Sequence, residues 1–117
     1  ELEQVLLNLI KNAVFAIKER MLSLNDIDEG IIHIHQYVLD NQCIISVVDN
    51  GIGMSAQTRK KIFEPFFTTK EVGAGTGLGL SVSYFIVCSH HNGQMQVESE
   101  FGHGCRFEIT LPLYIEA

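Results

Sequence analysis

The residues best suited to chemistry begin with a glycine-rich stretch, Gly73-Ala-Gly-Thr-Gly-Leu-Gly-Leu80. Its four alternating glycines lead into an apolar pattern with helical spacing. A glycine loop that runs into a helix start leaves several backbone N–H groups unpaired, and the helix dipole adds partial positive charge there. Such a place suits phosphate oxygens. Flexible glycine loops that hold no ligand show the same pattern, so the stretch alone leaves both interpretations open.

Two asparagines, Asn8 and Asn12, lie four residues apart and therefore on one face of a predicted helix. Asparagine is a mediocre helix former, and two of them beside an apolar stripe require hydrogen-bond partners. One interpretation is a pair of hydrogen bonds to a neighbouring helix, which the residues alone favour. The other is a carboxamide oxygen directed at a metal ion or a ligand.

A third candidate is Asp49, which ends an apolar strand and is followed by Gly51 and Gly53. A carboxylate on the apolar side of a strand is costly unless it accepts hydrogen bonds. The two glycines let the backbone bend and let a flat ligand come close. The alternative is an ordinary turn that leads into a short helix with Ser55 as its N-cap.

An aromatic segment, Phe63-Glu-Pro-Phe-Phe67, precedes Lys70. Its three phenylalanines are too dense for a solvated loop, and we expect them to pin this segment to the body of the domain. Lys70 stands at the head of the loop that leads to the glycines, where its ammonium group would meet phosphate. The alternative is a solvated surface lysine.

Composition limits the class of protein. The 117 residues are 46% hydrophobic and 19% charged, with a net charge of −6, which predicts one globular domain. The acidic balance argues against nucleic acid or an anionic membrane as a partner. The three cysteines (Cys43, Cys88, Cys105) lie in apolar contexts without a Cys-x-x-Cys, which predicts buried thiols in a reducing compartment and no zinc site.

The elements that must position these residues follow from apolar periodicity. It predicts helices over 2–21, 55–62 and from the glycine stretch to about 91, and strands over 31–39, 43–49, 94–99 and 105–111. This order implies an α+β two-layer sandwich, with helices on one face of a mixed, mostly antiparallel sheet. The other face, which carries His33, His35, Arg106 and Glu108, is expected to be open. The apolar pattern is already under way at Leu2, so we expect the chain to be a piece of a longer protein.

Taken in order, the motifs resemble one family. The chain carries Asn8-Leu-Ile-Lys-Asn12, Asp49-x-Gly51-x-Gly53, Phe63-Glu-Pro-Phe-Phe67 and Gly75-Thr-Gly-Leu-Gly-Leu80. They are similar to the asparagine box, first glycine box, phenylalanine box and second glycine box of sensor histidine kinase catalytic domains. The superfamily is shared with gyrase, Hsp90 and MutL. Gly102-His-Gly104-Cys-Arg-Phe107 resembles the family's final motif, with Cys105 where threonine is usual. The resemblance covers nearly the whole chain and implies a Bergerat-type ATP-binding fold.

The resemblance also implies a site for ATP and Mg²⁺. It makes Asn12 the Mg²⁺ ligand, with Asn8 supporting the metal or phosphate region, and Asp49 the acceptor for the adenine amino group. Asn12 and Lys70 would be the catalytic residues, and the phenylalanines would anchor a lid that closes over ATP. The further nucleotide contacts that it implies are Gly51, Gly53, Lys70, Gly75, Thr76, Gly77, Leu78 and Gly79.

Two positions depart from the family pattern. Phe15 stands where many histidine kinases have a lysine, so Lys70 must supply more of the positive charge or Lys18 must help. Asn8 stands where the related ATPases have a glutamate that activates water. Because an amide cannot act as a general base, the site favours phosphoryl transfer over hydrolysis.

By this resemblance, residues 1–117 form one catalytic domain of a two-component histidine kinase, truncated at its N-terminus before the first strand. None of the five histidines has the surroundings of a phosphoacceptor, so the implied partners are a separate dimerisation and histidine-phosphotransfer domain and, downstream, a response regulator. The expected location is cytoplasmic, without direct membrane contact by this domain and without nucleic acid, although the parent protein is free to be membrane-anchored. Two alternatives remain: a serine-directed kinase of the anti-sigma type, and a nucleotide-sensing module without phosphotransfer.

Overall fold

The computed structural model describes residues 2–64 and 79–113. The predicted order of elements is confirmed across these two ranges. In chain order they are α1 (Leu2–Ser23), β1 (Ile32–Leu39), β2 (Gln42–Asp49), α2 (Ala56–Lys61), α3 (Gly79–Phe85), the π-helical turn η1 (Ile86–His90), β3 (Gln94–Ser99) and β4 (Cys105–Pro112).

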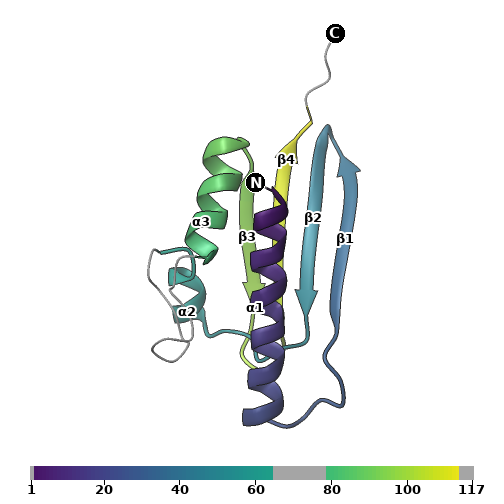
Figure 1. Cartoon of the computed structure of the whole chain (residues 1–117), viewed down its shortest axis with the longest axis vertical. Coiled ribbons are helices and arrows are strands. Elements are labelled where there is room, and N and C mark those ends of the chain that lie inside the picture. The colour runs from purple at the N-terminus through teal and green to yellow at the C-terminus, as the bar shows by residue number, and fades with distance from the viewer. Residues whose placement is uncertain (1, 65–78, 114–117) are drawn as a thin grey trace.

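The four strands form one sheet in the order β1-β2-β4-β3 (Figure 1). All three described pairings are antiparallel, where the sequence predicted a mixed, mostly antiparallel sheet. The β1–β2 connection turns at Asp40 and Asn41, whose φ angles of 52° and 60° are those of a tight hairpin turn. In this register Asp49 lies opposite Cys105 on β4, which brings the end of β2 beside the start of β4.

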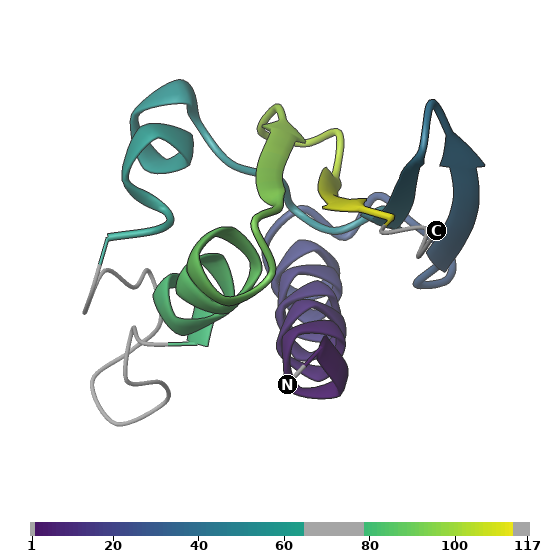
Figure 2. The ribbon, with the colours of Figure 1, turned by 90° about the horizontal axis from the view of Figure 1, so that it is seen from above.

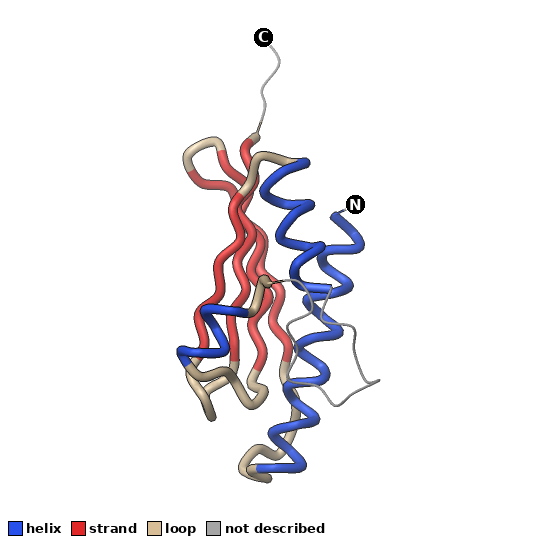
Figure 3. Tube along the Cα trace, turned by 90° about the vertical axis from the view of Figure 1, so that its left-hand side faces the viewer, coloured by secondary structure: helices blue, strands red, loops and turns tan. Residues whose placement is uncertain are grey.

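Two helices, α1 and α3, cover one face of the sheet, as Figures 2 and 3 show from two directions. The buried stripe of α1 follows the predicted periodicity. This stripe and the buried residues of η1 pack against the inner side chains of the strands. The short helix α2 lies beside the edge strand β3. The core formed in this way comprises Val5, Leu9, Val47, Ile86, Val87, Met95, Cys105, Phe107 and Ile109. The predicted α+β sandwich is therefore confirmed.

Coverage of the sheet is uneven. On β1 the apolar side chains Ile34 and Val38 face the helix layer but remain 52% and 63% exposed. On the opposite face, which was predicted to be open, Ser46 and Ile44 on β2 are buried. At Ser46 the neighbouring strand β4 contributes to this burial, since Arg106 Nη2 donates to Ser46 Oγ at 3.4 Å.

The predicted helix to residue 91 ends in a wider turn, η1, before Asn92 adopts a positive φ and Gly93 N–H bonds to the carbonyl of Val87. Of the three cysteines, all free thiols, only Cys105 is buried, whereas Cys43 and Cys88 are half-buried. No helix among the described residues has the length and apolarity that a bilayer crossing requires.

Candidate functional site

The site begins on the C-terminal half of α1. Asn12, Phe15, Ala16 and Glu19 recur at three- and four-residue steps, which places them on one face of the helix beside its buried stripe. Among residues 2–64 and 79–113, the Asn12 carboxamide and the Glu19 carboxylate have no hydrogen-bond partner. Both polar groups are therefore available to a ligand on this side of the helix.

The opposite wall starts at Asp49, the last residue of β2. Its side chain is only 5% exposed and points toward the helix layer, as the strand periodicity predicted. Oδ1 accepts a hydrogen bond of 2.8 Å from the backbone N–H of Gly51. Burial raises the pKa of Asp49 to about 6, and the Gly51 hydrogen bond opposes this shift only in part.

The loop from Asn50 to Met54 is fixed from both sides. Ile52 N–H donates to the carbonyl of Ala16 on α1 at 3.0 Å, and its own carbonyl accepts from Gly102 N–H at 2.6 Å. Met54 N–H donates to Ser99 Oγ at 2.9 Å. The loop thus forms a hydrogen-bonded floor between α1 and the β3–β4 turn.

Two glycines allow this close packing. A Cβ on Gly51 would lie 2.6 Å from the Cβ of Ala16, so α1 and the loop could not approach to their observed separation. Gly53 has a φ of +75°, and a Cβ there would overlap the carbonyl oxygen of Glu100. The backbone bend predicted for these glycines is seen at Gly53, whereas Gly51 is required by the close approach of α1.

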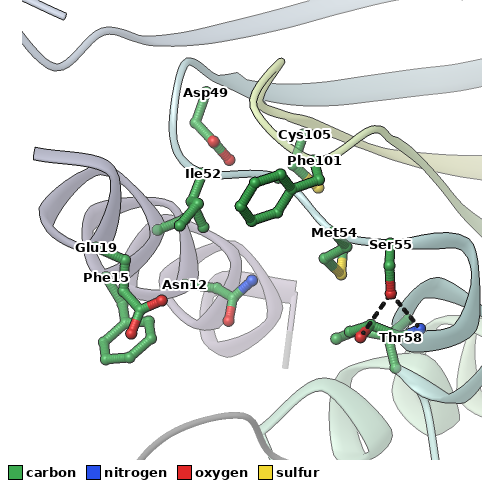
Figure 4. Close-up of a pocket in the computed structure, with 13 residues that line it drawn as sticks. Asn12, Phe15, Glu19, Asp49, Ile52, Met54, Ser55, Thr58, Phe101 and Cys105 are labelled. Carbon is green, nitrogen blue, oxygen red and sulfur yellow. Dashed lines mark hydrogen bonds between the residues drawn. The ribbon is translucent and has the colours of Figure 1, made fainter. Parts of the chain in front are cut away.

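Between these walls lies a cavity of about 240 Å³ (Figure 4). Asn12 from α1 and Asp49 from β2 point into it from opposite sides, and Ile52, Met54 and Phe101 supply apolar surface between them. The remaining lining residues are Phe15, Ala16, Glu19, Gly53, Ser55, Thr58, Ile62 and Cys105. An apolar cavity with a few convergent polar groups is suited to a flat organic ligand that donates a hydrogen bond to the carboxylate.

The described wall of this cavity carries negative charge. Asp49 and Glu19 contribute carboxylates, and no lysine or arginine is among the described lining residues. Cys105 lies beside Asp49, and burial together with that carboxylate raises the pKa of its thiol to about 12. The thiol is therefore a neutral part of the wall and is not activated as a nucleophile.

The two asparagines have different surroundings. Asn8 lies outside the cavity lining, and its Nδ2 donates to Ser83 Oγ at 3.1 Å and to the carbonyl of Gly79 at 3.3 Å. These bonds join α1 to the start of α3, which is the interhelical arrangement that the residues alone favoured. Asn12 instead faces the cavity.

Of the predicted site residues, Asn12, Asp49 and Gly53 line the cavity, Gly51 supports its floor, and Gly79 contacts Asn8. Lys18 is not among the described lining residues. The predictions for Phe66, Phe67, Lys70, Gly75, Thr76, Gly77 and Leu78 lie outside the described residues. Phe63 is described, and it stacks on Tyr84 of α3 with ring centroids 4.7 Å apart, as expected of an anchor.

Sequence reasoning missed Glu19 and Phe101. Glu19 could have been found, because it stands seven residues after Asn12 and two helical turns place it on the same face. Phe101 gave no such signal, since it lies in a turn and reaches the cavity only through the packing of that turn on the loop after β2. No cluster of three or more histidine, cysteine or carboxylate residues suited to a metal occurs in the described parts of the chain.

Comparison with known proteins gives consistent results. Residues 1–115 match the family model described as histidine kinase-, DNA gyrase B-, and HSP90-like ATPase. Sporulation kinase E of Bacillus subtilis (strain 168) is 44% identical over 114 residues, which cover 97% of this chain and 14% of that protein. The signal transduction histidine-protein kinase AtoS of Escherichia coli (strain K12) is 44% identical over 113 residues, which cover 96% of this chain and 17% of that protein.

Solved structures agree with these relatives. A nucleotide-free catalytic domain of histidine kinase ThkA superposes with a TM-score of 0.75 at 33% identity, covering 95% of this chain and 65% of that chain. The mycobacterial sensor histidine kinase MprB gives a TM-score of 0.74 at 25% identity, covering 93% and 68%. The chain thus spans about one seventh and one sixth of the length of the two curated relatives, and about two thirds of the solved catalytic domain.

Proposed function

Because the chain belongs to the histidine kinase-, DNA gyrase B- and HSP90-like ATPase family, we propose that it binds Mg-ATP in the cavity between α1 and the sheet. It then donates the γ-phosphoryl group to a histidine on a separate dimerisation and phosphoacceptor domain of the same protein. A response regulator is the proposed receiver downstream. The relatives that it matches over a small share of their length, sporulation kinase E and AtoS, support the presence of such further domains.

One observation carries the proposal: Asn12 and Asp49 face the same apolar cavity from opposite walls (Figure 4). The Asp49 carboxylate is a hydrogen-bond acceptor in the wall of a cavity whose apolar surface suits a purine ring. We assign it the adenine amino group. Ile52, Met54 and Phe101 would cover the ring faces and exclude water.

Asn12 suits a magnesium ion that arrives with the nucleotide. Mg²⁺ prefers oxygen ligands, keeps several waters and is often held by one or two protein groups together with substrate phosphates. A single cavity-facing carboxamide without a described partner fits that requirement, whereas a dedicated cage of carboxylates would not be needed. Bound there, the ion would supply charge neutralisation to the phosphates.

The charge of the site supports a dependence on this ion. The described wall has two carboxylates, Asp49 and Glu19, and no described basic residue. The polyphosphate would therefore rely on Mg²⁺ and on Lys70, which lies outside the described residues. Catalysis in this proposal consists of positioning and charge neutralisation.

The identity of residue 8 favours phosphoryl transfer over hydrolysis of ATP. The carboxamide of Asn8 is engaged with Ser83 and Gly79 and cannot act as a general base for water. Its supporting role toward the metal or phosphate region, in this proposal, is to hold α1 against the start of α3.

The test is phosphotransfer from γ-labelled ATP to the helical acceptor domain of the same protein, supplied separately. We expect label on the acceptor in an acid-labile form, as a phosphorylated histidine requires, and no label when Asp49 is replaced by Asn. Acid-stable label on a serine would indicate the anti-sigma type of kinase. Tight ATP binding without any transfer would indicate a nucleotide-sensing module.

A further inference from the structure

A half-buried arginine, Arg20, binds the loop that directly follows Asp49. Arg20 lies near the end of α1, and its side chain is only 12% exposed. Its Nη1 donates to two consecutive carbonyls, those of Asn50 and Gly51, at 3.2 Å each. The end of α1 and the end of β2 lie at the same end of the molecule, which makes this contact possible (Figure 1).

The remaining guanidinium nitrogens are held by one carboxylate. Nε and Nη2 donate to the two oxygens of Asp26 at 2.8 and 3.0 Å, in a bidentate arrangement. Asp26 lies in the loop between α1 and β1. Because all three nitrogens are engaged, the planar group has little freedom to rotate, and its direction toward the carbonyls is fixed.

The peptide that Arg20 holds is the one that orients Asp49. The carbonyl of Asn50 and the N–H of Gly51 belong to one planar unit and point in opposite directions. Arg20 binds the carbonyl, and the N–H donates to Asp49 Oδ1 at 2.8 Å. The next peptide is held in the same way, since Gly51 offers its carbonyl to Arg20 while the N–H of Ile52 donates to Ala16.

From this geometry we infer that Arg20 is a positioning residue for base recognition, acting through the Asn50–Gly51 peptide on the direction of the Asp49 carboxylate. This inference rests on the proposed function, in which Asp49 accepts the adenine amino group. Asp26 has the supporting role of orienting Arg20. Loss of Arg20 would let the peptide rotate, and the carboxylate would lose the N–H that directs it into the cavity.

The experiment compares two ligands in calorimetric titrations: ATP, and purine riboside 5′-triphosphate, which lacks the 6-amino group. The wild-type chain should prefer ATP. We define the preference for ATP as the Kd of purine riboside 5′-triphosphate divided by the Kd of ATP. Arg20→Met keeps the aliphatic stem and removes every donor, and we expect it to reduce this ratio by about tenfold, the scale of one charge-assisted hydrogen bond. Arg20→Lys retains a charge that reaches one carbonyl and should restore part of the ratio. Asp26→Asn should reduce the ratio by a smaller factor.

Arg106→Met is the matched control. Arg106 also pairs with a single carboxylate, Glu108, at 2.9 Å, but it lies on the opposite face of the sheet and outside the cavity lining. Its substitution should leave the ratio unchanged. Thermal unfolding of each variant shows whether it is folded, and Arg20→Lys and Asp26→Asn keep the inference testable if Arg20→Met does not fold.

Two outcomes separate this inference from the proposed function. If the Arg20 and Asp26 variants weaken the binding of both ligands equally and leave the ratio of the Kd values unchanged, Arg20 has only a structural role. That result would overturn this inference and leave the proposed function standing. A wild-type chain that binds both ligands equally, or an Asp49→Asn variant that retains the preference for ATP, would overturn the assignment of Asp49 to adenine itself.

Discussion

At the scale of single residues, Asp49 is held where burial opposes its charge. The pKa is raised to about 6, so at neutral pH the folded chain keeps an ionised carboxylate in a poorly solvated wall. Its single described hydrogen bond, from Gly51, offsets part of that cost. A group kept at a cost to stability, and directed into a cavity, is characteristic of binding sites.

Replacing this carboxylate should change binding and stability in opposite directions. In Asp49→Asn the amide oxygen can still accept from Gly51, but the amide nitrogen presents a donor to the adenine amino group. We expect ATP binding to weaken by about 2–4 kcal/mol. At pH 7.5 the free energy of unfolding should rise, since no charge is buried. Calorimetric titration and urea unfolding would measure the two effects, and unchanged ATP affinity would contradict the adenine assignment.

The pH dependence of that stability difference follows from the pKa. In the folded chain Asp49 binds its proton more tightly than in the unfolded chain, where its pKa is near 3.8. The contribution of the protonated Asp49 to the free energy of unfolding is therefore complete below about pH 3.8, and it is lost as the pH rises through about 6. Relative to Asp49→Asn, the wild-type chain should lose about 2 kcal/mol of unfolding free energy between pH 4 and pH 7. Parallel stability curves for the two proteins would contradict this expectation.

Asn12 should act through the metal and leave the base contacts unaffected. We expect Asn12→Ala to weaken ATP binding in Mg²⁺ by about 1–2 kcal/mol, as loss of a polar contact to a charged group would. Metal-free ADP binding should change much less, because the carboxamide lies on the α1 wall, away from Asp49. Titrations with and without Mg²⁺ would measure both, and equal losses would make Asn12 a structural residue.

At the scale of elements, the loop after β2 is shaped by its neighbours more than by its own sequence. Ala16 on α1, Ser99 at the end of β3 and Gly102 in the β3–β4 turn each bond to its backbone. Ser99 Oγ also donates to the carbonyl of Gly104 at 2.7 Å, so one hydroxyl links the loop to the hairpin. The floor of the cavity is thus built by three elements.

Alanine substitutions of two glycines with similar backbone angles test how tightly the floor of the cavity is packed. Gly53 and Gly102 have φ angles of +75° and +84°, but a Cβ would overlap the Glu100 carbonyl only at Gly53 and would meet nothing within 4 Å at Gly102. Gly102→Ala should therefore cost about 1 kcal/mol, from the backbone angle alone. Gly53→Ala should cost more than about 2 kcal/mol and should also weaken ATP binding. Urea unfolding and titration would compare them, and equal effects would mean that the floor adapts.

At the scale of the whole molecule, the two edge strands of the described sheet differ in cover. On β3, Met95 is buried beneath the helix layer, whereas β1 is exposed from His33 to Leu39. We expect hydrogen exchange to be slowest in β2 and β4 and faster in β1 than in β3, since local opening of β1 breaks few buried contacts. Equal protection of the two edges would indicate that β1 is covered in solution.

The sequence by itself determined the elements and the direction of their side chains. The three- and four-residue spacing of Val5, Leu9, Ala13 and Ile17 defined α1, and the period of two in β2 placed Asp49 on the inner face. Ser55 was predicted as an N-cap, and its Oγ accepts from Thr58 N–H. These features depend on neighbours within a few residues, so local spacing is sufficient to predict them.

Only the tertiary structure decided which of these residues share the site. The packing of α1 against both the sheet and α3 places Asn8 against Ser83 and Asn12 in the cavity, although their spacing alone puts both asparagines on one face of the helix. Phe101 reaches the cavity, and Arg20 the loop after β2, from segments that are far away along the chain. Contacts of this kind depend on how whole elements pack across layers, which no local pattern of residue types encodes.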